Sequence, residues 1–207
     1  MRVLIESQYL PPIAYFVLIA HAEEVWIESQ EKFEKQTYRN RCEILGANSL
    51  QRLTVPVHSA NSGLLIQKML IDHRQKWMNN HWRAVQSAYG KSPFFDHYSE
   101  YLQTELYRTT DSLFELNHRL LTLCLRLMGI KTKINLTEKY DLKPAEDIFD
   151  CRSAIHPKKG IAGLTWFQPE MYYQVFGKDF APNLSIVDLM FCMGPDSFMV
   201  LKKSGVF

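Results

Sequence analysis

The first 28 residues are arranged as a short apolar strand, a proline-containing loop, an apolar helix and a second strand. The pattern predicts strands at Arg2–Ile5 and Val25–Glu28, and Ile13–Ala22 between them has its apolar residues at helical spacing. Pro11 and Pro12 end the first strand, because proline cannot continue a strand or lie inside a helix. This order within about thirty residues predicts a βαβ unit.

Polar side chains follow both predicted strands. Glu6, Gln8 and Tyr9 come after the first strand, and Glu28 and Gln30 lie at the end of the second. Since units of this kind place their ligands at the carboxyl ends of the strands, both loops are expected to open on one edge of the sheet. Gln8 and Tyr9 are therefore candidate ligand-binding residues, and the alternative for them is a loop that caps the next helix.

The rest of the chain changes twice in composition and predicted structure. A helical middle is followed by a polar stretch and then by an aromatic-rich segment at 164–180. The expected strands are at 41–45 and 53–57, which form a hairpin, and at 64–71 and 130–136. The expected helices are at 77–89, 95–108, 112–128 and 186–190.

These patterns predict the α/β class: an N-terminal Rossmann-like βαβ unit with a mixed sheet, a central helical region and an aromatic-rich C-terminal segment. One domain over 1–207 is expected, with possible lobes at 1–75, 76–129 and 130–207.

Composition limits the class of protein. Of the 207 residues 46% are hydrophobic, so the chain can bury a core without disulfides or a metal, and the net charge of +2 does not favour nucleic-acid binding. No apolar stretch is long enough for a membrane span. The cysteines lack the close pairs that a zinc site needs, which predicts reduced thiols in a cytoplasmic protein and no metal: Cys42, Cys124, Cys151 and Cys192.

The segment Lys35–Arg41 concentrates cations, side-chain amides and a phenol. On a strand, Arg39 and Arg41 would point to the same face, and guanidinium forks bind phosphate or carboxylate with two parallel hydrogen bonds. Lys35, Tyr38 and Asn40 would complete such an anion site. The alternative is a basic loop whose arginines pair with nearby glutamates.

Two histidines are candidates for proton transfer, because their ordinary pKa lies near neutral pH. His81 lies in a predicted helix beside Trp82, where a structural role is the alternative. His156 lies in a basic segment with Arg152, Lys158 and Lys159, which could be a surface loop or a lid over an anionic ligand.

Further candidates lie in apolar or aromatic surroundings. The Tyr15 hydroxyl could reach a pocket from the first helix, and Tyr173 and Gln174 could bind a ring-containing ligand unless their segment belongs to the core. Asp188 lies in an apolar helix and needs a partner, which could be a backbone cap or an arginine such as Arg39 or Arg41.

Several segments together resemble the WbqC-like family. The matching segments are Gln8–Phe16, Lys35–Arg41, Leu53–Val57, Asn80–Arg83 with Ser92–Phe95, and Pro182–Leu189. The first departs from the family pattern, because Pro12 and Ala14 stand where Trp or Tyr and then Gly are usual. The resemblance implies a bacterial cytoplasmic protein associated with the synthesis of O-antigen and other surface polysaccharides.

The expected function is a transferase that acts on a nucleotide-activated sugar or another small anionic substrate. The alternative is a non-catalytic binding module in a glycan-biosynthesis assembly. The sequence contains no phosphate-binding P-loop, no nucleophile elbow and no dinucleotide-binding glycine motif. It therefore identifies neither a cofactor nor a reaction, and it leaves the oligomeric state open.

Overall fold

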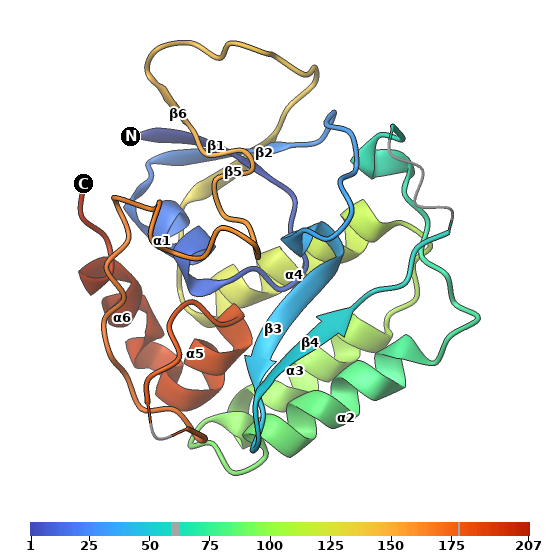
Figure 1. Cartoon of the computed structure of the whole chain (residues 1–207), viewed down its shortest axis with the longest axis vertical. Coiled ribbons are helices and arrows are strands. Elements are labelled where there is room, and N and C mark those ends of the chain that lie inside the picture. The colour runs from blue at the N-terminus through green and yellow to red at the C-terminus, as the bar shows by residue number, and fades with distance from the viewer. Residues whose placement is uncertain (59–62, 178) are drawn as a thin grey trace.

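A parallel sheet of four strands forms one end of the molecule, at the top of Figure 1. The computed structural model describes residues 1–58, 63–177 and 179–207. The strands run in the order β5-β2-β1-β6, with bounds β1 (Arg2–Glu6), β2 (Glu24–Glu28), β5 (Lys133–Leu136) and β6 (Ile148–Asp150). Val3 of β1 lies opposite Val25 of β2 in a parallel pair, which confirms the predicted βαβ unit.

Helix α1 (Ile13–His21) connects β1 to β2 and is buried from Ile13 to Ala20, since it is apolar on every side. Pro12 precedes it in an extended conformation, so the helix begins directly after the prolines. The first turn is capped by the C-terminal part of the chain: the Ala14 N–H donates to Asn183 Oδ1 at 2.8 Å. Helices α5 and α6 lie beside α1 in Figure 1.

The antiparallel strands form a sheet of their own. The short 3₁₀ turn η1 (Tyr38–Asn40) leads into β3 (Arg41–Leu45), which pairs with β4 (Leu50–Thr54). The hairpin was predicted correctly, although its second strand begins at Leu50 and not at Leu53. The expected mixed sheet is wrong, because the parallel strands form one sheet while β3 and β4 pair only with each other and β3 packs against helices.

Three helices form the middle of the chain, as the spacing of apolar residues predicts: α2 (Trp77–Tyr89), α3 (Phe95–Tyr107) and α4 (Leu113–Leu127). Ser112 caps α4, because its Oγ accepts a hydrogen bond of 3.2 Å from the Glu115 N–H. Along α4, buried leucines face the core, and this face also carries the buried amide Asn117.

The predicted strand at 64–71 is wrong. This segment contains the 3₁₀ turn η2 (Ile66–Lys68), which buries Ile66 and Met69 while Leu70 stays exposed. The last predicted helix is longer than expected, α5 (Ile186–Met193), and is followed by η3 (Gly194–Asp196) and α6 (Ser197–Lys203). The described part of 164–180 contains turns and irregular backbone and no helix or strand.

Candidate functional site

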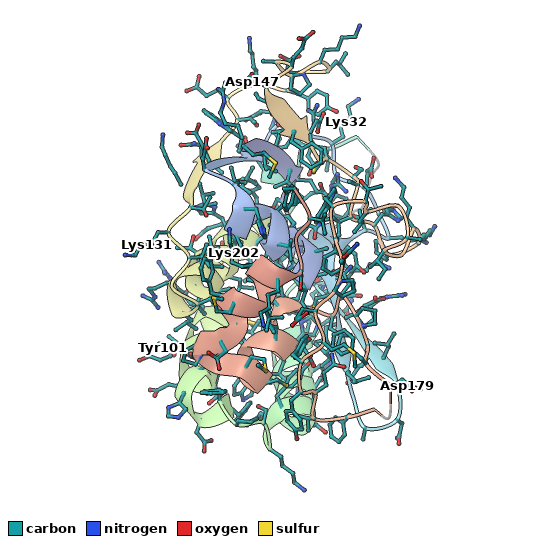
Figure 2. All side chains as sticks on the ribbon, turned by 90° about the vertical axis from the view of Figure 1, so that its left-hand side faces the viewer. Lys32, Tyr101, Lys131, Asp147, Asp179 and Lys202 are labelled. Carbon is teal, nitrogen blue, oxygen red and sulfur yellow. The ribbon has the colours of Figure 1, made fainter. Side chains whose placement is uncertain are left out.

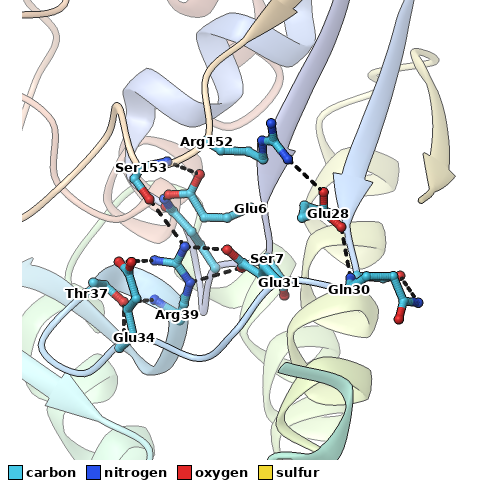
Figure 3. Close-up of polar contacts among 12 residues, drawn as sticks. Glu6, Ser7, Glu28, Gln30, Glu31, Glu34, Thr37, Arg39, Arg152 and Ser153 are labelled. Atoms are coloured by element: carbon cyan, nitrogen blue, oxygen red, sulfur yellow. Dashed lines mark hydrogen bonds and ion pairs between the residues drawn. The ribbon is translucent and has the colours of Figure 1, made fainter. Parts of the chain in front are cut away.

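Three neighbouring strands of the parallel sheet end in an acidic residue. Glu6 ends β1, Glu28 ends β2 and Asp150 ends β6. The carboxyl ends of parallel strands meet at one edge, so these carboxylates gather there, as Figure 3 shows for Glu6 and Glu28. Glu6 is 1% exposed and Glu28 0%, so both are buried charged groups that need partners.

Glu6 is held by the loops around it. Its Oε1 accepts a hydrogen bond of 2.7 Å from Gln8 Nε2, and its Oε2 accepts one of 2.9 Å from the Ser153 N–H. The Tyr15 hydroxyl donates to the Glu6 backbone carbonyl at 3.0 Å. Glu6 therefore connects the loop after β1 with the segment that follows β6.

Arg152 connects the ends of β2 and β6. Its Nε and one terminal nitrogen donate to Asp150 at 3.0 and 2.7 Å, and its other terminal nitrogen donates to Glu28 Oε2 at 3.1 Å. Its guanidinium lies 4.7 Å from the ring centre of Tyr140, a cation–π distance. Thr137, after β5, donates to the other oxygen of Glu28 at 2.6 Å.

Arg39 forms a two-pronged pair with Glu31. Its Nε donates to Oε1 at 3.0 Å and its Nη2 donates to Oε2 at 2.5 Å, and both side chains are buried. Nη1 makes a longer contact of 3.5 Å with Glu34, whose side chain is more than half exposed. Figure 3 shows this pair beside Glu6 and Ser153. Such a pair fixes the orientation of both groups.

The pKa of Glu31 is raised to about 7. Burial is the main cause, and the negative charges of Glu6 and Glu28 act in the same direction, while Arg39 opposes the shift. A carboxyl group that titrates near neutral pH can both accept and return a proton under physiological conditions. Glu31 is therefore the candidate acid–base residue of this edge.

Helix α4 holds the Arg39 segment through a hydrogen bond from Asn117. Asn117 Nδ2 donates to the Arg39 backbone carbonyl at 2.8 Å and to Ser7 Oγ at 3.2 Å, and Asn117 is buried. One amide thus fixes the loop after β1 and the turn that carries Arg39.

A cavity of about 750 Å³ opens at this edge. Its charged lining consists of Glu31, Lys32, Glu34, Arg39, Asp150 and Arg152. Its apolar and aromatic lining consists of Leu65, Tyr140 and Leu142. Figure 2 places Lys32 near the upper end of the molecule, which is the end that carries the sheet in Figure 1. A volume of this size accommodates a small-molecule ligand.

Gln8, Tyr9 and Tyr15 lie under this edge and do not line the cavity. All of them are buried, and Gln8 and Tyr15 hold Glu6 as described. The Tyr9 hydroxyl lies 2.9 Å from His81 Nδ1. These three residues are therefore structural: they hold Glu6 and His81 in place and do not face the cavity.

His81 lies in the core, away from the cavity lining. Its Nε2 lies 3.2 Å from the Thr54 carbonyl, which can only accept, so Nε2 carries the hydrogen and Nδ1 accepts from Tyr9. Burial lowers the pKa of His81 to about 4. Its imidazole is therefore neutral at pH 7 and connects α2, β4 and the loop after β1.

His156 and Lys35 also lie outside the cavity lining. His156 is half-buried, and its Nδ1 accepts from the Lys158 N–H at 3.0 Å. Burial together with Lys159 and Lys158 lowers its pKa. Lys35 is exposed.

The structure separates Arg39 from Arg41. Arg39 lies in the turn η1 while Arg41 begins β3, so the two do not share one strand face. Tyr38 and Asn40 are buried beside them: the Tyr38 hydroxyl contacts Glu43 at 3.4 Å, and Asn40 Nδ2 donates to the Val55 carbonyl at 2.8 Å. Arg39 alone of this segment lines the cavity.

Asp188 and the aromatic segment form a separate polar cluster. Asp188 Oδ2 accepts from the Tyr172 hydroxyl at 2.5 Å and from Gln174 Nε2 at 3.0 Å, so the expected arginine partner is wrong. Gln174 also donates to the Ala181 carbonyl at 3.0 Å. Tyr173 is 60% exposed and lies outside the cavity lining.

Sequence reasoning left Glu31, Asp150 and Tyr140 out of the candidate site. The signal for Glu31 was present, since an acidic run directly precedes the basic segment. Asp150 and Arg152 stand two residues apart, which allows their fork-like contact. Nothing in the local sequence signals the contact between Arg152 and Glu28, 124 residues apart.

The fold and the site define an α/β protein with a charged cavity at the carboxyl edge of a parallel sheet. The WbqC-like protein family model matches residues 6–159 and 152–200, so the chain belongs to this family. The chain is also 28% identical, over 218 residues covering 94% of each sequence, to Uncharacterized protein Rv1507c of Mycobacterium tuberculosis (strain ATCC 25618 / H37Rv). No solved structure matches the chain significantly.

Within residues 1–58, 63–177 and 179–207, no helix has the length and apolar character needed to cross a bilayer. The same residues contain no group of three or more histidine, cysteine or acidic side chains placed to bind a metal ion.

Proposed function

We propose that this protein is a transferase of bacterial surface-polysaccharide synthesis that acts on a nucleotide-activated sugar or another phosphorylated substrate. The reaction would take place in the cavity at the carboxyl edge of the sheet. The observation that carries this proposal is Glu31, a buried carboxyl group that lines the cavity and has a pKa of about 7. Membership of the WbqC-like family supports the biosynthetic setting.

Glu31 would act as the base of the transfer. An acceptor hydroxyl or amine attacks the transferred group of the activated sugar, and its proton passes to the Glu31 carboxylate. The bond to the phosphate leaving group breaks, and the phosphate keeps the electron pair. Glu31 then returns the proton to the leaving group or to solvent. The fork of Arg39 holds the carboxylate in a fixed orientation throughout.

The phosphate of the substrate would be bound at the rim. Lys32 is exposed there, and Nη1 of Arg39 faces the exposed carboxylate of Glu34 at 3.5 Å. A phosphate can replace Glu34 at this nitrogen without disturbing the pair between Arg39 and Glu31. The ring of Tyr140 and the side chain of Leu65 supply apolar surface for a sugar or base.

A thermal-shift screen of nucleotides, nucleotide sugars and sugar phosphates tests the proposal. At millimolar concentration a true ligand raises the melting temperature of the wild type. Glu31→Gln should still bind that ligand but should lose turnover at least about a hundredfold, as expected for a general base. Glu100→Gln, at an exposed position of α3, is the matched control. It should leave ligand binding and turnover unchanged. Failure of every phosphorylated compound to stabilise the wild type would contradict the proposal.

The second candidate function, a non-catalytic binding module, is favoured by Leu142. This leucine is 82% exposed at the rim of the cavity, where a partner protein could cover it. Leu142→Lys should then abolish the capture of proteins of the same pathway. A protein that stays monomeric, captures no partner and turns over a small substrate would exclude this function.

A further inference from the structure

The buried charges at the carboxyl edge do not balance. Glu6, Glu28 and Glu31 are three carboxyl groups, each at most 5% exposed. The buried cations that contact them are the two guanidinium groups of Arg39 and Arg152. Removing charges from water is costly unless opposite charges compensate. With all three carboxyl groups ionised, this network is one positive charge short, which agrees with the raised pKa of Glu31.

The walls of the cavity do not remove this deficit. They add the carboxylates of Glu34 and Asp150 and the ammonium group of Lys32. Lys159 lies near the rim, since its Nζ donates to the Ser153 carbonyl at 3.1 Å. Five carboxyl groups then face four cations. His156 nearby does not add a charge at pH 7, because burial and two lysines lower its pKa.

Glu31 has unused capacity to accept hydrogen bonds. Among the described residues its two oxygens accept only from Arg39, one bond each. An ionised carboxylate offers about four lone-pair positions. Glu31 is more than nine-tenths buried and nevertheless lines the cavity, so a group that enters the cavity can approach its side chain.

We propose that the ligand of this cavity carries a positively charged amino group, and that this group binds against Glu31. The inference rests on the proposed function for the location of the site and narrows its substrate class to amine-bearing sugars or sugar phosphates. An ammonium group supplies three N–H donors and the missing charge, whereas a hydroxyl supplies neither the charge nor as many donors. Glu34 and Asp150 add to the attraction from the cavity wall.

Four probes separate this inference from the proposed function: glucosamine, glucose, glucosamine 1-phosphate and glucose 1-phosphate. Their affinities for the wild type are measured by calorimetry at pH 7. The amine should strengthen binding at least about tenfold within each pair. Equal affinities within both pairs, or no binding of either amine, would overturn the inference. The phosphate should strengthen binding on its own account. An amine effect without a phosphate effect would support the inference and count against the proposed function.

Substitutions at Glu31 and Glu34 test which carboxylate binds the amino group. Glu31→Gln should reduce the amine preference to about onefold, and Glu34→Gln should reduce it partly. Glu34 is exposed, so this second variant keeps the test valid if Glu31→Gln does not fold. Glu100→Gln should keep the full preference. A folded Glu31→Gln protein that retains the wild-type preference would overturn the assignment of the amino group to Glu31.

Discussion

Asn117 on α4 donates a hydrogen bond of 2.8 Å to the backbone carbonyl of Arg39, 78 residues earlier in the chain. The same amide donates to Ser7 Oγ at 3.2 Å. The position of the carboxyl edge of the sheet is thus fixed in part by a helix that contributes no charge to the cavity.

Replacing Asn117 should destabilise the protein through this contact. Asn117→Ala leaves the buried Arg39 carbonyl and Ser7 without their donor, so the free energy of unfolding should fall by about 1–3 kcal/mol. Urea unfolding measures the change. Thr122→Ala, which removes an exposed hydroxyl from the same helix, should stay within about 0.5 kcal/mol of the wild type. Equal effects of the two substitutions would refute the role of Asn117.

The second prediction compares a buried and an exposed arginine fork. Arg39→Lys keeps the charge but loses the two-pronged contact with Glu31, and should lower the free energy of unfolding by about 1–3 kcal/mol. Arg52 makes a similar contact with Glu43 on the exposed hairpin. Arg52→Lys should cost at most about 1 kcal/mol, because solvent screens that pair. Melting curves of both variants without ligand measure the loss of stability. A larger loss in Arg52→Lys than in Arg39→Lys would contradict the prediction.

The raised pKa of Glu31 predicts a pH dependence with a definite sign. The folded state holds the proton up to about pH 7, whereas the unfolded chain releases it near pH 4.5. Between these values the folded state binds more protons, so this contribution to stability is full below pH 4.5 and is lost as the pH rises towards 7. The difference in unfolding free energy between wild type and Glu31→Gln should therefore fall over this window. A difference that does not vary with pH would show that Glu31 titrates normally.

His81 should behave as a structural histidine. A proton titration followed by NMR should give a pKa near 4, and the ring should stay neutral at pH 7. Because the unfolded state binds a proton more readily between about pH 4 and 6.5, the stability that His81 contributes should rise with pH over this range. His81→Ala should lower the free energy of unfolding by about 1–3 kcal/mol, since Tyr9 loses its partner.

The exposed His97 on α3 provides the control for His81. His97→Ala should change the stability by no more than about 0.5 kcal/mol. If His81→Ala instead left stability unchanged and abolished turnover, the catalytic role expected from the sequence would be restored.

The sequence predicts the βαβ unit because local signals agree there: two apolar strands, two prolines and a helix that is apolar on every side. It misplaces 64–71 because an apolar run can fill a core from a turn as well as from a strand, and here Ile66 and Met69 do so. Arg39 and Arg41 were expected on one face because the turn η1, which separates them, has no clear signature in Tyr38–Asn40.

The candidate site is harder to predict for a different reason. Its ion pairs join segments that are distant in the chain, as Arg152 and Glu28 are, and a single sequence does not reveal which acid meets which base. The edge itself was predictable, since the polar residues after β1 and β2 follow directly from the strand pattern.

The cap that Asn183 places on α1 has a consequence for the order in which the protein is completed during synthesis. The Leu10 carbonyl also accepts from Ser185 Oγ at 2.8 Å, and the Pro11 carbonyl accepts from the Ile186 N–H at 2.9 Å. Asn183 leaves the ribosome 169 residues after Ala14, and Ser185 leaves it 175 residues after Leu10. The loop after β1 is made among the first parts of the chain, but it cannot form these hydrogen bonds until the C-terminal residues have been synthesised.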